Sequence, residues 1–274
     1  MVLKLSALLE LSASSGFVLS NEMKAAMETS LKLKQQELGG RWTGLTHKFM
    51  TTSGKDYYVA LTQLAPPVLT EGKLVSSVKY AVSQDGVTWM DLDMDSVSEE
   101  SREKAGKITT WLSGDLAKIY TVEEPAPEPE APPEPAEGEE APPEPEPLPP
   151  IVFEVTEMER LICMLGEVTM TCFLCPKGFI VADADNKYNE NPVFPGLAYP
   201  DKLSSYLHGF DGDMSADKDV TGEWALAYDS FKGVATVKSL KYPGFVHYYD
   251  ATSKDCYNFY CGTGLKDTDL AFMI

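Results

Sequence analysis

The chain has 274 residues, of which 43% are hydrophobic and 10% aromatic, so it can bury a sizeable core as one large domain or two small ones. Its formal net charge of −19 excludes the electrostatic footprint of a protein that binds nucleic acid or an anionic membrane. No apolar run approaches the roughly 20 residues needed to cross a bilayer, and five cysteines, an odd number, argue against a secreted disulfide scaffold.

The N-terminal segment predicts two helices. The first is amphipathic, because its leucines recur at helical spacing, at Leu5, Leu8, Leu9 and Leu11. Glu10 interrupts the apolar stretch that a signal peptide would need. The second runs from Ser20 to Leu38, with Met23, Ala26, Met27 and Leu31 on one face and Gly39-Gly40 as its stop. We therefore expect a cytosolic protein with a helical N-terminus.

The next portion is rich in predicted strands. A hairpin is expected from Leu74 to Met90, because Asp85-Gly86 tolerates the positive φ values of a tight two-residue turn. Ser96-Val-Ser-Glu99 predicts the start of another helix, which would run toward Trp111 and be weakened by Gly106.

An acidic block from Glu123 to Pro150 separates the two halves. It holds 12 of the 19 prolines and 10 of the 42 acidic residues, with no Lys or Arg, so about half of the net charge is local. It lacks large apolar residues until Leu148, which predicts a disordered, extended and solvated insert. Two interpretations stay open: a tolerated surface insertion, which we favour, and a docking segment.

The second half begins with a helix and ends in strands. Thr156-Glu-Met-Glu159 is a capping box, followed by Met158, Leu161, Ile162 and Leu165 at helical spacing, and Gly166 is the predicted end. A hairpin from Val168 to Ala182 would turn through Pro176-Lys177-Gly178. From Gly222 to Gly262, Gly and Pro-Gly punctuation between β-branched and aromatic runs predicts an antiparallel meander.

These elements indicate an α+β protein, with N-terminal helices and a mainly antiparallel β-sheet that a disordered acidic Pro/Glu-rich insert interrupts. The expected divisions are 1–122 for the helices and first β-rich portion, 123–150 for the insert, and 151–274 for the helix and the meander. The apolar C-terminal end, Asp269 to Ile274, is expected to dock on the sheet or on a neighbouring subunit, because exposing its large side chains would cost roughly 1.5–3 kcal/mol each.

The Cys172-Phe-Leu-Cys175 motif is the first candidate for metal or redox chemistry. A functional motif of this kind lies at a helix N-terminus or in a tight knuckle, where both sulfurs reach one point. Here the flanking residues predict a strand, on which residues three apart face opposite sides. Cys256 and Cys261 have the same problem, so we interpret these cysteines as structural.

Asp211 to Asp219 forms a near miss for a calcium loop, with oxygen-bearing side chains at alternate positions. The sixth position is Ala216, where the loop needs glycine, and the twelfth is Gly222, where a bidentate Glu is expected. A solvated acidic loop is the better interpretation. We predict no metal and no cofactor for the chain.

The remaining signals for catalysis are weak. The three histidines lie in separate segments, at His47, His208 and His247. The sequence contains neither a nucleophile elbow nor a phosphate-binding glycine loop. Tyrosine-rich runs at 57–58, 248–249 and 257–260 indicate sheet packing, with an interface as the alternative. We predict no catalytic, cofactor-binding or metal-binding residues and therefore no enzyme.

Several segments, in order, resemble one family. Near the C-terminus these are Leu240-Lys-Tyr-Pro-Gly-Phe245, an aromatic run into Gly262-Thr-Gly264, and Asp269-Leu-Ala-Phe-Met273. Upstream they are Gly40-Arg-Trp-Thr-Gly-Leu45, Asp56-Tyr-Tyr-Val-Ala60, Glu159-Arg-Leu161, Pro176-Lys-Gly178 and Lys202-Leu-Ser-Ser-Tyr-Leu-His208. No single piece is specific, but the ordered combination is similar to the radial spoke head protein 9 family, over most of the chain except the insert.

The resemblance implies a non-catalytic structural subunit of the radial spoke head in the axoneme of motile cilia and flagella. It implies other radial spoke head proteins as partners, namely those of the 4 and 6 type and further head subunits, a homodimer within the two-fold spoke head, and central-pair projections as a further contact. The alternative function is a metal-dependent or redox regulator that uses Cys172 and Cys175 or the Asp211 to Asp219 loop. Nucleic acid and membranes are not expected as partners.

Overall fold

The computed structural model describes residues 5–70, 73–124, 151–184, 186–209 and 214–270. Within these residues the α-helices are α1 (Leu5–Ser12), α2 (Asn21–Leu38), α3 (Glu99–Gly106) and α4 (Glu157–Cys172), and the 3₁₀ helices are η1 (Ala13–Ser15), η2 (Leu203–Ser205) and η3 (Ala216–Lys218).

One large sheet joins strands from both halves of the sequence. In the described residues its order is β13-β14-β15-β16-β1-β2-β5-β6. In chain order these strands are β1 (Trp42–Phe49), β2 (Tyr57–Gln63), β5 (Val78–Ser83), β6 (Met90–Leu92), β13 (Trp224–Asp229), β14 (Val234–Ser239), β15 (Phe245–Asp250) and β16 (Cys256–Gly262). All neighbours are antiparallel except β1 and β16, which pair in parallel with His47 opposite Tyr260. The predicted α+β class, mainly antiparallel sheet and C-terminal meander are confirmed.

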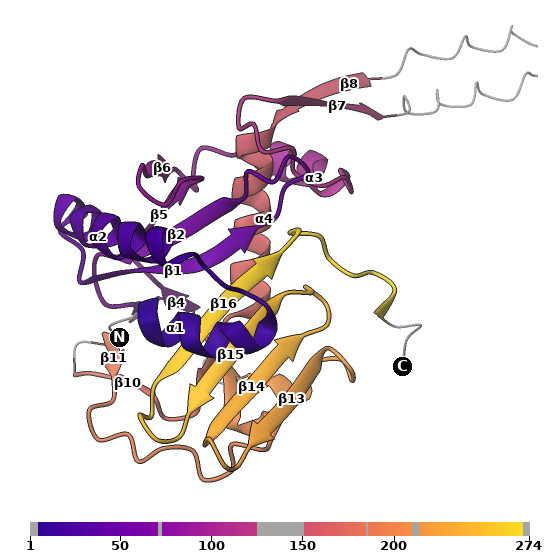
Figure 1. Ribbon diagram of the computed structural model, residues 1–274. Coiled ribbons are helices and arrows are strands. Elements are labelled where there is room, and N and C mark those ends of the chain that lie inside the picture. Colours follow the sequence, from indigo (N-terminus) through magenta and orange to yellow (C-terminus); the bar gives the residue numbers. More distant parts are fainter. Residues whose placement is uncertain (1–4, 71–72, 125–150, 185, 210–213, 271–274) are drawn as a thin grey trace, which may run out of the picture.

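In the part of the chain that the structure describes, four short two-stranded ribbons accompany this sheet. They pair β3 (Val68–Thr70) with β4 (Lys73–Val75), β7 (Ile119–Glu124) with β8 (Ile151–Thr156), β9 (Leu174–Pro176) with β12 (Tyr206–His208), and β10 (Ile180–Ala182) with β11 (Tyr188–Glu190). The β7–β8 ribbon projects from the body of the protein (Figure 1). Residues 125–150 of the predicted insert lie outside the described residues, whereas its first two, Glu123 and Glu124, belong to β7 and pair with Val152 and Ile151.

The sheet is covered on both faces, α1 and α2 on one and α4 on the other (Figure 1). The α2 helix begins and ends as predicted: Ser20 accepts a hydrogen bond from the Met23 amide, and Gly39 closes the helix in the left-handed region at φ 62°. Leu8 and Met27 from these helices are fully buried against the sheet. The predicted amphipathic helices therefore form one outer layer.

The α4 helix starts as predicted but does not end as predicted. Thr156 and Glu159 form both bonds of the capping box, yet the helix continues through Gly166 to Cys172. The strand and hairpin predicted from Val168 are therefore wrong, since β9 pairs with β12 and not with β10. Burial explains the difference: Val168, Thr169 and Cys172 are enclosed by the sheet, and this packing outweighs the modest helix propensity of a glycine and β-branched residues.

Two other local predictions need correction. The hairpin of β5 and β6 exists, but its connection runs from Gln84 to Trp89 and is not a two-residue turn; Asp85 accepts bonds from the Val87 and Thr88 amides and holds this longer loop. The α3 helix is capped by Ser98, not Ser96, and ends at Gly106 well before Trp111. Apolar residues 271–274 of the predicted docked end lie outside the described residues.

Candidate functional site

The Cys172 and Cys175 thiols do not form a joint site. Cys172 closes α4 and its Sγ donates to Ser239 Oγ at 3.6 Å, whereas the Cys175 Sγ in β9 donates to the Pro176 carbonyl at 3.6 Å. Burial raises the pKa of Cys172 to about 12, so this thiol stays protonated and is a poor nucleophile or metal ligand. The helix, not the predicted strand, places Cys172.

Cys175 has a different sulfur neighbour, which the spacing of the sequence did not reveal. A hydrogen bond with Cys175, together with burial, raises the pKa of Cys256 well above its ordinary value. The partners are far apart in the chain and meet because β9 packs on the end of β16. Both are reduced. Cys256 and Cys261 belong to the two opposite-facing cores, as their odd spacing on β16 predicts.

The acidic Asp211 to Asp219 loop is only partly described, because 210–213 lie outside the described residues. Its last carboxylate is already engaged: Asp219 Oδ2 lies 2.7 Å from His208 Nε2 and accepts from Trp224 Nε1 at 2.6 Å. Asp217 accepts from Ser215 Oγ. In the described ranges, no group of three His, Cys, Asp or Glu side chains is arranged to hold a metal ion.

Two of the three histidines lie in the sheet. Burial lowers the pKa of His47 to about 3 and that of His247 to about 4, so both are neutral at pH 7. His47 Nδ1 lies 2.9 Å from Thr46 Oγ1, and His247 Nδ1 lies 2.8 Å from Asn258 Oδ1. His47 Nε2 also lies 3.4 Å from Thr169 Oγ1, so the bonding partners of both rings in the described residues are hydroxyl and amide groups and not carboxylates. Both rings act as sheet-packing groups.

The densest polar site in the described residues is centred on Glu157, the first residue of α4. The residue is fully buried, yet its carboxylate accepts five hydrogen bonds. Oε1 accepts from Tyr57 Oη and the Gly114 amide, each at 2.8 Å. Oε2 accepts from the Ser113 amide at 2.8 Å, Ser113 Oγ at 2.6 Å and Tyr120 Oη at 2.6 Å. We call this set the Glu157 network.

The electrostatics of the Glu157 network favour a permanent carboxylate. Burial alone would raise the pKa of Glu157, but the hydrogen bonds from Ser113, Tyr120 and the Gly114 amide outweigh it and lower this pKa below its ordinary value. The helix N-terminus adds favourable partial positive charge. Burial and the bond to Glu157 raise the pKa of Tyr57, so its hydroxyl stays a donor.

Arg160 extends the network one turn along α4. This fully buried guanidinium donates to the carbonyls of Ile108, at 3.0 Å, and Thr110, and its centre lies 5.1 Å from the ring of Tyr120. Together the two charged residues tie the loop before β7, and β7 itself, to α4. Every carboxylate lone pair is used, so the arrangement is suited to holding a scaffold rather than to proton transfer. Sequence reasoning identified the capping box beside Glu157 but not this role, because the donors come from three distant segments.

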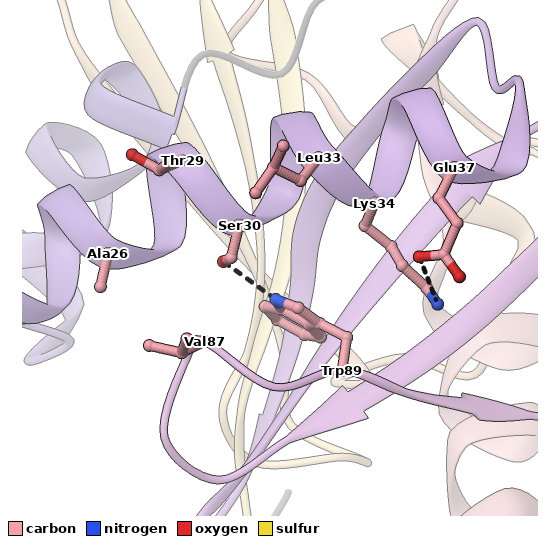
Figure 2. A pocket seen from close by; sticks show the side chains of 8 residues that line it. All are labelled: Ala26, Thr29, Ser30, Leu33, Lys34, Glu37, Val87 and Trp89. Atoms are coloured by element: carbon pink, nitrogen blue, oxygen red, sulfur yellow. Dashed lines mark hydrogen bonds and ion pairs between the residues drawn. The ribbon is translucent and has the colours of Figure 1, made fainter.

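A shallow groove of about 320 Å³ lies between α2 and the loop that joins β5 to β6 (Figure 2). Its polar groups are bonded to one another: Trp89 Nε1 donates to Ser30 Oγ at 2.9 Å, and Lys34 Nζ lies 3.2 Å from Glu37 and 2.9 Å from Asp91. The rest of its lining is largely apolar. These contacts hold the loop against the helix and already engage Ser30, Lys34 and Trp89, the polar side chains best placed to orient a substrate.

The described residues contain no helix of the length and apolar character needed to cross a membrane. No protein-family model matches the chain.

The similarity to known proteins extends from end to end. Radial spoke head protein 9 homologs from Homo sapiens and Bos taurus are 25% and 24% identical to this chain over 296 aligned residues, and the homolog from Danio rerio is 23% identical over 290. Each alignment covers 97% of this chain and 97% of the relative. The chain is therefore similar over nearly its whole length to radial spoke head protein 9 homologs, which supports the resemblance found in its sequence.

Proposed function

We propose that this chain is a non-catalytic structural subunit of the radial spoke head in the axoneme of motile cilia and flagella. The observation that carries the proposal is the alignment over 97% of both chains with proteins named as radial spoke head protein 9 homologs. An alignment of this extent spans nearly all of both chains and is therefore not confined to one module shared by unrelated proteins.

The geometry supports a scaffold role. The buried Glu157 carboxylate and the Arg160 guanidinium at the N-terminus of α4 hydrogen-bond to the loop at 108–116 and to β7, which joins the helix, this loop and the β7–β8 ribbon as one unit. A rigid unit of this kind would move as one body when a neighbouring subunit pushes on it, without a change in its internal packing. In the spoke head it would support assembly and the relay of signals between the central pair and dynein.

The proposed partners are the radial spoke head proteins of the 4 and 6 type and further head subunits. A second copy of the chain within a two-fold head and the central-pair projections are the other proposed contacts. The insert joins β7 to β8, and this ribbon projects from the body of the protein (Figure 1), so a docking role of the insert remains the alternative to a tolerated insertion. The proposed partners include no nucleic acid, membrane or cofactor. The proposed location of the protein is the cytoskeleton of the cilium.

The test is a tagged chain expressed in cells that build motile cilia and lack their own copy. We expect the tag along the axoneme, restored beating, and co-purification of other spoke-head subunits from axonemal extracts. Recovery of the tag only in the cell body, with no spoke-head subunit attached, would refute the proposal.

Metal analysis of the purified chain distinguishes the structural subunit from the alternative function. A stoichiometric bound metal would favour the regulator that uses Cys172 and Cys175 or the Asp211 to Asp219 loop.

A further inference from the structure

The two edge strands of the large sheet, β6 and β13, differ in whether they are protected against pairing with a further strand. At one end β6 has three residues, and its Asp91 is held by Lys34 of α2 at 2.9 Å. At the other end β13 has six residues, pairs with β14 without a bulge, and contains neither proline nor lysine. Natural sheets block their edges with short strands, charges, prolines or bulges. The β6 edge is blocked in this way, and the β13 edge is open (Figure 1).

The backbone of β13 has a row of groups that point out of the sheet. The Leu240 amide donates to the Glu223 carbonyl, so Glu223 faces β14. Hydrogen-bonding direction alternates along an antiparallel strand. The peptide groups of Trp224, Leu226 and Tyr228 therefore face away from β14, where no strand of the described ranges pairs with them.

Apolar side chains gather at the two ends of this edge. Phe231, in the turn between β13 and β14, is 97% exposed, and Val220, just before β13, is 67% exposed. Leu240, opposite Glu223, and Tyr228 are also exposed. Exposed aromatic and aliphatic side chains that flank an open edge are typical of a surface that another chain covers.

We propose that a second copy of this chain pairs with β13, strand to strand and antiparallel, about a two-fold axis at Ala227. This pairing specifies the interface of the homodimer named in the proposed function. It relies on the proposed function only for the location of the dimer in the cilium. Leu226 of each copy lies opposite Tyr228 of the other, in two pairs whose outward-facing peptide groups form four backbone hydrogen bonds. On the other sheet face Ala227 meets Ala227 of the second copy, and Ala225 meets Asp229.

Charge repulsion favours this register over a shifted one, and the need for a closed assembly favours β13 of the second copy over its β6 as the pairing strand. A two-fold axis at Leu226 would place Glu223 opposite Asp229, a like-charge pair that destabilises a sheet. An axis at Ala227 places Phe231 opposite Glu223, toward the exposed Val220 and Leu240 of the second copy. Pairing β13 with the β6 edge of another copy would extend into an open filament, but Lys34 and Asp91 block that edge. A closed pair of β13 edges remains.

The test is the mass of the purified full-length chain, measured by sedimentation velocity over a dilution series. We expect a dimer. Ala227→Lys and Ala227→Glu each place like charges directly opposite at the axis, so each should weaken dimerisation at least about tenfold. An equal mixture of the two variants should restore the dimer, because the charges are then complementary. Ala227 is exposed, so both variants should keep the wild-type circular dichroism spectrum and melting temperature.

Ala225→Lys is the matched control, since it lies on the same exposed face of β13 but opposite Asp229 of the second copy, and it should leave the dimer intact. A wild-type chain that stays monomeric at every concentration would overturn the proposal, as would a dimer that survives both Ala227 variants or a mixture that stays monomeric. If the monomeric chain binds another spoke-head subunit through Ala227, the edge belongs to that subunit and self-pairing is wrong. These results concern the purified chain, so they are independent of whether the tagged chain reaches the axoneme.

Discussion

Replacing Glu157 with glutamine should destabilise the protein although the side chain keeps its size. Each oxygen of this buried carboxylate accepts one backbone amide, from Gly114 on Oε1 and from Ser113 on Oε2. An amide side chain has one oxygen, so either orientation leaves one of these backbone N–H groups facing an NH₂ donor. The hydroxyls of Tyr57 and Tyr120 can rotate, but a backbone amide cannot.

The size of the effect follows from that unpaired donor and from the lost charge. A buried donor without a partner costs about 1–3 kcal/mol, and charge-assisted bonds are worth more than neutral ones. We therefore expect a loss of about 2–4 kcal/mol in the free energy of unfolding. For a chain of this length the melting temperature should fall by roughly 4–16 °C.

The assay is thermal and urea unfolding of both proteins, followed by circular dichroism. Glu159→Gln is the matched control: it lies in the same first helical turn, its Oε2 accepts only from the Thr156 amide and hydroxyl at 2.8 Å, and glutamine also completes a capping box. It should change stability by less than about 1 kcal/mol. If Glu157→Gln melts within the error of the wild type, the five hydrogen bonds do not stabilise the fold and the scaffold argument built on them is wrong.

Three further predictions concern pH, the insert and the C-terminus. His47 and His247 have folded-state pKa values of about 3 and about 4, below the unfolded value near 6.5, so their contribution to stability is complete above pH 6.5 and is lost as the pH falls toward those values. The free energy of unfolding should drop by about 2 kcal/mol per histidine between pH 7 and pH 5, and a urea midpoint that does not move over this range would contradict it. Replacing 125–150 by Asn-Gly should leave the melting transition cooperative and within a few degrees of the wild type, because Glu124 and Ile151 are already paired neighbours; loss of the transition would show that the segment is structural. Truncation after Thr268 removes Leu270, which lines a groove of about 610 Å³, together with the apolar end, and should lower the melting temperature or spoke-head incorporation; an unchanged truncated protein would show that this end contributes to neither.

Local chemistry in the sequence determined the elements whose ends are set by adjacent residues. The Ser20 cap and Gly39 bound α2, the capping box at Thr156 starts α4, and the turns that contain Gly233 and Gly244 separate β13 from β14 and β14 from β15. Each of these signals acts within four or five residues through a hydrogen bond or a backbone conformation, so no tertiary contact is needed to interpret them.

The tertiary structure decided what depends on distant partners. The passage of α4 through Gly166 follows from burial against the sheet, the parallel pairing of β1 with β16 joins residues more than two hundred positions apart, and the five donors to Glu157 come from three segments. The same holds for the contact between Cys175 and Cys256. Spacing along the chain does not reveal such contacts, because they form only when the core packs. The family resemblance predicted the role proposed for the protein, and the packed fold shows which residues hold its scaffold together.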